Sequence, residues 1–156
     1  MVDIEIVDVQ PQNVMGMTRK GPYQIIAQMI PELFQYLVPK GAQFAGPPMF
    51  LCHETSMEQA EQADAEGSAE VEVVVPVASE IAGTDEISFY ELPGGKMAKT
   101  THQGPYEECK ATYEKLLAWI GQNQHRIAGP IREIYLNDPR EVPPEEILTE
   151  IHAPIE

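Results

Sequence analysis

Several stretches of the chain alternate apolar and polar residues, which is the period of a strand that buries one face. Residues 4–9 (IEIVDV) show this pattern, and a strand is also expected at residues 71–77 (VEVVVPV) because they are rich in β-branched valine. Residues 87–92 lead into Pro93-Gly94-Gly95, which is typical of a hairpin turn. Further strands are expected at residues 97–102, at residues 147–155 and after each Ala-Gly-Pro segment, so that about eight strands are predicted.

Two other segments place apolar residues three and four positions apart, which is the spacing of a helix. A Gly-Pro-Tyr sequence opens each of them, and proline is tolerated in a first helical turn because its missing N–H would be unpaired there. Helices are therefore expected within residues 21–38 and 104–120. The apolar stripes are Tyr23, Ile26, Ile30, Leu33, Phe34 and Leu37 in the first helix, and Tyr106, Cys109, Tyr113, Leu116, Leu117 and Ile120 in the second.

The two helical segments belong to a repeated sequence. The Gly-Pro-Tyr segment at residues 21–23 recurs at 104–106, which is 83 positions later. An Ala-Gly-Pro segment at residues 45–47 recurs at 128–130 with the same offset, and the apolar positions between the motifs match as well. Two copies of one unit are therefore predicted, at residues 14–51 and 97–134.

The length and the repeat together predict the fold class. A chain of 156 residues fits a single domain, expected here over residues 1–156. The expected class is α+β, with two β-α-β-β units related by a pseudo-two-fold axis. They would share an antiparallel sheet of about eight strands, carry two helices and leave a cleft between the halves. Residues 55–70, rich in Ala, Gln and acids, are expected to form a surface connection or a short exposed helix.

The charge of the chain excludes some partners. Acidic residues outnumber basic ones by 25 to 10, which gives a net charge of −15. Such a surface repels phosphate backbones and anionic lipid headgroups, so direct binding to nucleic acid or to a membrane is not expected. No apolar stretch approaches the roughly 20 residues of a membrane span, and the acidic N-terminal segment is unlike a secretory signal. A cytoplasmic protein is expected, with Cys52 and Cys109 as reduced thiols.

The sequence gives no support for a metal or cofactor site. Its four histidines, His53, His102, His125 and His152, are scattered without the spacing of metal ligands. The phosphate-binding pattern GxxxxGK[ST] is absent, and no serine or cysteine lies in a nucleophile motif. We therefore expect neither a metal nor a cofactor.

Residues 104–120 (GPYEECKATYEKLLAWI) and 128–155, with the ELPGGK turn at 91–96, resemble the GyrI-like small-molecule-binding domain. This domain is also the effector-binding domain of AraC-type and MerR-type bacterial regulators, and the likeness covers nearly the whole chain. The resemblance implies that each half lays a helix on a shared antiparallel sheet, with a cleft for an apolar or cationic organic ligand. It also points to one acid, Glu133, in the strand after the second Gly-Pro.

Strand periodicity also gives Glu133 unusual surroundings. Ile131, Glu133 and Tyr135 share one face of the predicted strand because side chains alternate. An ionised carboxylate between large residues is costly unless a partner or a cationic ligand compensates its charge, which would suit recognition of drug-like cations. The alternative is a solvated strand carboxylate that pairs with an Arg or a Lys.

Aromatic rings would supply the rest of such a pocket, because they offer dispersion contacts and a negative face toward cations. Phe50 stands at the repeat position of Glu133, and Trp119 lies at the edge of the second helical stripe. For each ring the alternative is ordinary packing in the core. The candidate ligand-binding residues are Glu133, Tyr135, Phe50, Tyr106, Trp119 and Tyr36.

Three functions are compatible with these features. The first is a stand-alone protein that binds a small organic ligand in transcription regulation or toxin resistance, since about a dozen residues before the first repeat are too few for a helix-turn-helix. The second is a hydrolase of strained cyclopropane-type genotoxins, as some GyrI-like proteins are, with Glu133 as the catalytic base that activates water. The third is a protein-binding module that acts on a partner such as DNA gyrase. A single carboxylate without an evident acid partner favours binding over catalysis.

Overall fold

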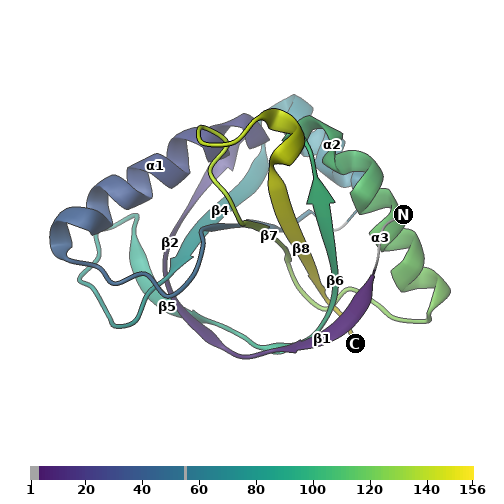
Figure 1. Cartoon of the computed structure of the whole chain (residues 1–156), viewed down its shortest axis with the longest axis horizontal. Coiled ribbons are helices and arrows are strands. Elements are labelled where there is room, and N and C mark those ends of the chain that lie inside the picture. The colour runs from purple at the N-terminus through teal and green to yellow at the C-terminus, as the bar shows by residue number, and fades with distance from the viewer. Residues whose placement is uncertain (1–3, 55) are drawn as a thin grey trace.

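The computed structural model describes residues 4–54 and 56–156, which form one antiparallel sheet of eight strands with helices packed on it (Figure 1). The strands are β1 (Glu5–Val9), β2 (Gln12–Gly21), β3 (Met49–Cys52), β4 (Ala69–Pro76), β5 (Ser88–Leu92), β6 (Gly95–Gln103), β7 (Ile131–Tyr135) and β8 (Leu148–Pro154). Their order across the sheet is β1-β6-β8-β7-β3-β4-β2-β5. The predicted α+β class with an antiparallel sheet is confirmed.

Two long helices cover one face of the sheet, and both were predicted. Each begins after a single 3-10 turn, at Tyr23–Ile25 and at Tyr106–Glu108, and buries its apolar stripe against the strands. Leu33 and Leu116, which are equivalent in the two helices, have no exposed surface. The helices are α1 (Ile26–Leu37), α2 (Met57–Glu66) and α3 (Cys109–Gln122), of which α1 and α3 are the two long ones.

Helix α2 is a third helix where the fold prediction had two. None of its residues is buried, so the sequence lacks the apolar stripe that identifies a helix most clearly. Capping holds it instead: the Ser56 hydroxyl accepts a hydrogen bond from the backbone N–H of Gln59 at 3.1 Å. Gly67 ends it with a φ of 65°, a left-handed conformation that suits glycine.

The two halves repeat the same elements 83 positions apart. This offset, to within one residue, relates the starts of four pairs of elements: β1 and β5, β2 and β6, α1 and α3, and β3 and β7. The repeated elements therefore include β1 and β5, which lie outside the predicted units. The offset is smaller for β4 and β8, because α2 lengthens the connection in the first half while the second half has a 3-10 turn at Pro144–Glu146.

The outermost strands are exchanged between the halves. Strand β1 pairs with β6 of the second half, and β5 pairs with β2 of the first half. The registers are equivalent, since Glu5 lies opposite Lys99 and Ser88 lies opposite Gly16. At the centre β3 pairs with β7, so each half completes the sheet of the other.

Apolar clusters fill both faces of the sheet. The larger cluster lies between the sheet and the helices and includes residues of α1, α3 and every strand except β1. The smaller cluster lies on the opposite face, because its residues alternate with those of the larger one along β2, β3 and β4. It consists of Val14, Met49, Leu51, Val74 and Leu92.

Candidate functional site

Glu133 lies near the centre of the sheet, on the face that the helices cover. It belongs to β7, where side chains alternate, so that Tyr135 shares its face and Arg132 points to the opposite one. Its neighbours across the sheet are Phe50 of β3 and Ile151 of β8. The strand register therefore fixes the position of the carboxylate.

Two tyrosine hydroxyls donate hydrogen bonds to Glu133. Tyr113 of α3 donates to Oε2, and Tyr135 of β7 donates to Oε1 at 3.1 Å. Across the described residues, Glu133 forms no ion pair with a Lys, an Arg or a His. The alternative of a strand carboxylate paired with a basic side chain is therefore wrong for this acid.

The surroundings of Glu133 raise the pKa of its carboxyl above the ordinary value. The largest cause is the loss of water around the side chain, while the hydrogen bonds from Tyr113 and Tyr135 and the nearby His102 act in the opposite direction. Burial, followed by the charge of Glu133, raises the pKa values of both tyrosines well above the ordinary one. The phenols therefore stay protonated and remain donors to the carboxylate.

Two buried thiols lie near this group. Cys52 and Cys109 are both free, and burial, followed by the charge of Glu133, raises the pKa of each thiol to about 12. The thiolate, which is the nucleophilic form of cysteine, is therefore scarce at neutral pH. Glu133 and the tyrosines remain as the groups that can act on a ligand here.

Two further rings flank Glu133. Tyr106, in the 3-10 turn before α3, lies edge-to-face with Tyr135 at a centroid distance of 5.4 Å and is 38% exposed. On the other side, Phe50 is buried and lies edge-to-face with Tyr23 at 5.7 Å. The structure thus gathers four of the predicted site residues, Glu133, Tyr135, Tyr106 and Phe50.

The other two predicted site residues, Trp119 and Tyr36, make contacts of their own. Trp119 stacks with His125 at a centroid distance of 6.2 Å, and Tyr36 donates a hydrogen bond to the carbonyl of Ala82. Within the described part of the chain, neither makes a hydrogen bond or a ring contact with Glu133 or with the rings beside it. Both side chains instead pack against the larger apolar cluster, toward the C-terminal ends of their helices.

Tyr113 is a partner of Glu133 that the sequence reasoning did not identify. The stripe of the second helix gave it a packing role only. The available signal was its spacing, because Tyr113 follows Tyr106 by seven residues, or about two helical turns, so both rings lie on one side of the helix. A buried tyrosine hydroxyl needs a hydrogen-bond partner, and Glu133 is the acid on the strand that faces it.

The first half of the chain has a buried acid at a different place. Glu54, just after β3, is 9% exposed and accepts hydrogen bonds from the Tyr23 hydroxyl at 2.6 Å and from the backbone N–H of Glu70 at 3.1 Å. These bonds tie the end of β3 to the start of β4. Glu54 therefore has a structural role, whereas the hydrogen bonds of Glu133 come from side chains alone.

The group around Glu133 combines a carboxylate, two phenol donors and flanking rings. Among the described residues, no cluster of three or more His, Cys, Asp or Glu side chains is arranged to hold a metal ion. No helix in residues 4–54 or 56–156 is long and apolar enough to cross a membrane. A carboxylate lined by rings can attract a cation, and a carboxylate whose pKa is raised is a stronger base toward water.

Solved structures share this fold at low sequence identity. The C-terminal domain of EcmrR is 19% identical, with a TM-score of 0.89, over 100% of this chain and 98% of that one. In the EcmrR–DNA complex the match has a TM-score of 0.88 and the same identity, over 99% of this chain, which spans 57% of that chain.

Two further structures match over 99% of this chain. SAV2435 bound to tetraphenylphosphonium is 15% identical, with a TM-score of 0.65 over 94% of its length. The hydrolase lin2189 from Listeria innocua is 16% identical, with a TM-score of 0.66 over 92% of its length. No curated protein matches the chain. The model of the GyrI-like small molecule binding domain matches residues 2–156, and the chain therefore belongs to the GyrI-like family.

Proposed function

We propose that this protein binds organic cations with aromatic groups, and that Glu133 recognises their positive charge. One observation carries the proposal: Glu133 is a partly buried carboxylate that lacks an ion-pair partner among the described residues and lies between aromatic rings. Two similar structures support it, since SAV2435 holds tetraphenylphosphonium and the matched part of EcmrR belongs to a DNA-bound protein.

The energetics of the site favour a cation over a neutral ligand. Burial raises the pKa of Glu133, so the ionised form is stabilised less by its surroundings than it would be in water. A bound cation supplies the missing opposite charge, and the rings of Tyr135 and Phe50 provide apolar contact beside it. Tyr106 contacts Tyr135 and is more exposed than these rings, so it is the ring that a ligand can contact from solvent.

Within this proposal the GyrI-like domain of this chain acts as an effector-binding domain. Ligand capture would serve transcription regulation or resistance to toxic cations in the cytoplasm. The domain of EcmrR that the chain resembles is one part of a longer protein that is bound to DNA, which supports a role for the shared fold in regulation.

Titration with tetraphenylphosphonium tests the proposal. We expect Glu133→Gln to weaken binding by about 10- to 100-fold, because a charge-assisted contact in a desolvated site is lost. Glu91→Gln, on an exposed position of β5, removes the same charge elsewhere and should leave the dissociation constant within about twofold. Isothermal titration calorimetry measures all three proteins.

A neutral ligand of similar shape sharpens this experiment. Triphenylphosphine oxide carries three of the same rings without a net charge, and its affinity should be nearly equal for the wild type and Glu133→Gln. Equal tetraphenylphosphonium affinity in these two proteins would show that the carboxylate does not recognise the cation.

A second candidate function is hydrolysis of strained, cyclopropane-type electrophiles. The observation in its favour is that Glu133 combines a raised pKa with a place beside two phenol donors, in a fold that lin2189, a hydrolase, shares. Glu133 would take a proton from water while the oxygen attacks a ring carbon and the ring opens. Mass spectrometry of such an alkylator tests it: water addition that is lost in Glu133→Ala supports hydrolysis, and equal product with both proteins contradicts it.

A further inference from the structure

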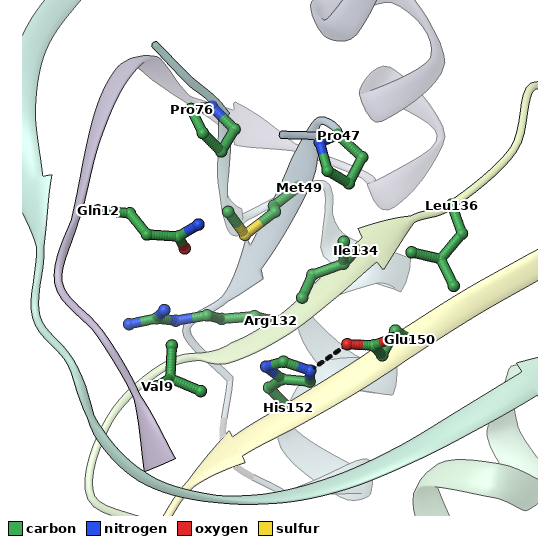
Figure 2. A pocket seen from close by; sticks show the side chains of 10 residues that line it. All are labelled: Val9, Gln12, Pro47, Met49, Pro76, Arg132, Ile134, Leu136, Glu150 and His152. Carbon is green, nitrogen blue, oxygen red and sulfur yellow. Dashed lines mark hydrogen bonds and ion pairs between the residues drawn. The ribbon is translucent and has the colours of Figure 1, made fainter. Parts of the chain in front are cut away.

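A cavity of about 240 Å³ lies on the face of the sheet opposite the helices (Figure 2). This volume corresponds to roughly eight water molecules at about 30 Å³ each, so a small organic molecule fits. Val9 and Gln12, where the chain passes from β1 to β2, line one side, and strands of the sheet line the other. The lining is mostly apolar, through Val9, Pro47, Met49, Pro76, Ile134 and Leu136.

The guanidinium of Arg132 is buried at this cavity. Arg132 is only 4% exposed, and its Nη2 donates a hydrogen bond to the carbonyl of Pro93 at 2.6 Å. Within the described residues it makes no ion pair and no other hydrogen bond. A guanidinium has five N–H donors, so most of those on Arg132 lack a protein acceptor.

The acids on the same face are engaged by other groups. Glu150 lies 2.5 Å from Nε2 of His152 and 3.8 Å from Nζ of Lys99. Glu72 of β4 accepts a hydrogen bond at 2.5 Å from the Tyr90 hydroxyl. Burial lowers the pKa of His152, and the charges of Lys99 and Arg132 lower it further, while Glu150 raises it. The His152 ring is therefore neutral at neutral pH. Arg132 is therefore the cation that the described wall of the cavity presents.

The pseudo-two-fold symmetry shows that the fold does not require a charge here. Met49 stands at the position equivalent to Arg132, and it pairs with Val74 as Arg132 pairs with His152. Met49 and Val74 are buried in the smaller apolar cluster. The first half thus places an apolar pair at the position where the second half places a buried cation beside an open space. Burial lowers the pKa of Arg132, and the charge of Glu72 offsets this only in part, so a bound anion would stabilise the guanidinium further.

We propose that this cavity binds a small organic carboxylate, which Arg132 holds through paired hydrogen bonds while the apolar wall covers the hydrocarbon body. Arginine and carboxylate groups match in geometry, because two parallel N–H···O bonds form between them. The carboxamide of Gln12 reaches into the same space (Figure 2). The site is separate from Glu133 and takes a ligand of opposite charge, so it goes beyond the cation-binding function proposed above.

Octanoate is the probe for this site, and octanamide is its neutral counterpart. Binding is followed by NMR of the Met49 methyl group, assigned with Met49→Leu, because this side chain lines the cavity. We expect octanoate to bind at least about tenfold more tightly than octanamide. Arg132→Met, which copies the residue at the equivalent position, should weaken octanoate binding by about 10- to 100-fold. Arg132→Lys should weaken it by a smaller factor.

Two variants serve as controls. Arg126→Met removes the same charge from an exposed position and should leave octanoate affinity within about twofold. Glu133→Gln should also leave it unchanged, which separates the outcome of this test from that of the cation site.

Several outcomes overturn the proposal. The proposal is wrong if the wild type and Arg132→Met bind octanoate with equal affinity, or if octanamide binds the wild type as tightly as octanoate. It is also wrong if octanoate, at concentrations below those at which octanoate forms micelles, leaves the Met49 resonance unshifted. If Arg132→Met does not fold, Arg132→Lys provides the test, and unchanged affinity in that variant contradicts paired hydrogen bonding.

Discussion

At the scale of single residues, two neighbours in β7 carry opposite charges to opposite faces of the sheet. Glu133 faces the helices and accepts hydrogen bonds from two tyrosines, whereas Arg132 lines the cavity on the other face. A shift of the strand register by one residue would exchange the two side chains, so the pairing of β7 with its neighbours determines both sites.

The raised pKa of Glu133 predicts a pH-dependent cost to stability. Between the unfolded and the higher native pKa, the native state binds more protons than the unfolded state, so the free energy of unfolding falls as pH rises. Below about pH 4, where both states are protonated, the native state has the full stability that the protonated carboxyl allows, and this stability is lost as pH rises. Glu133→Gln removes this dependence, so its stability should rise relative to the wild type as pH increases, by up to about 1.4 kcal/mol per pH unit within that window.

Urea denaturation of both proteins from pH 4 to pH 8 measures this difference. Glu91→Gln controls for the loss of one negative charge from an acidic chain. A wild-type stability that rises through the window relative to Glu133→Gln would mean that the native state favours the ionised carboxylate.

At the scale of elements, one glycine lets three strands pack closely. Gly16 of β2 lies between β5 and β4, and Tyr90 of β5 extends over it to donate its hydrogen bond to Glu72. A Cβ at Gly16 would meet Cγ1 of Val74 at 2.7 Å and would clash with the Tyr90 hydroxyl. The side-chain contact across β2 therefore depends on the absence of a side chain at this position.

Gly16→Ala should destabilise the protein by about 1–3 kcal/mol, because the added methyl group overpacks this contact. Tyr90→Phe removes the clashing hydroxyl, so the double variant should lose less stability than the sum of the two single variants. Gly121→Ala is the matched control, since a Cβ there meets no atom within 4 Å and α3 should gain about 0.5–1 kcal/mol. Urea denaturation measures each value, and additive losses would contradict a clash with the hydroxyl.

At the scale of the whole molecule, the repeat made much of the fold predictable. The shared offset of 83 residues carries tertiary information, because it matches strands and helices that single-segment patterns leave uncertain. Helix α2 has no apolar stripe, so hydrophobic periodicity did not count it, and composition gave a short exposed helix only as one of two expectations for residues 55–70. The exchange of β1 and β5 was not predictable either, because a strand pattern says nothing about which partner the strand takes.

The candidate sites were likewise predictable from the sequence only in part. The alternation of β7 placed Tyr135 on the face of Glu133, and the repeat identified Phe50 as its equivalent, which the strand register sets opposite it. The hydrogen bond from Tyr113 and the cavity beside Arg132 depend on how helix and sheet faces pack, which sequence spacing alone does not reveal. Trp119 shows the converse, since a conspicuous aromatic residue stacks on His125 away from this group.

The pairing of Phe50 with Glu133 has a consequence for the origin of the fold by gene duplication. The two residues occupy the same position of the repeat and lie directly opposite each other, so the pseudo-two-fold axis passes between them. In a homodimer of one half, that position would face its own copy, and the Cβ atoms of two glutamates would lie about 4.5–5.5 Å apart, so that two like charges would be neighbours. Covalent fusion of the halves removes this restriction. It allows one copy to keep an acid while the other becomes a ring, and thus gives a symmetric scaffold one anionic centre.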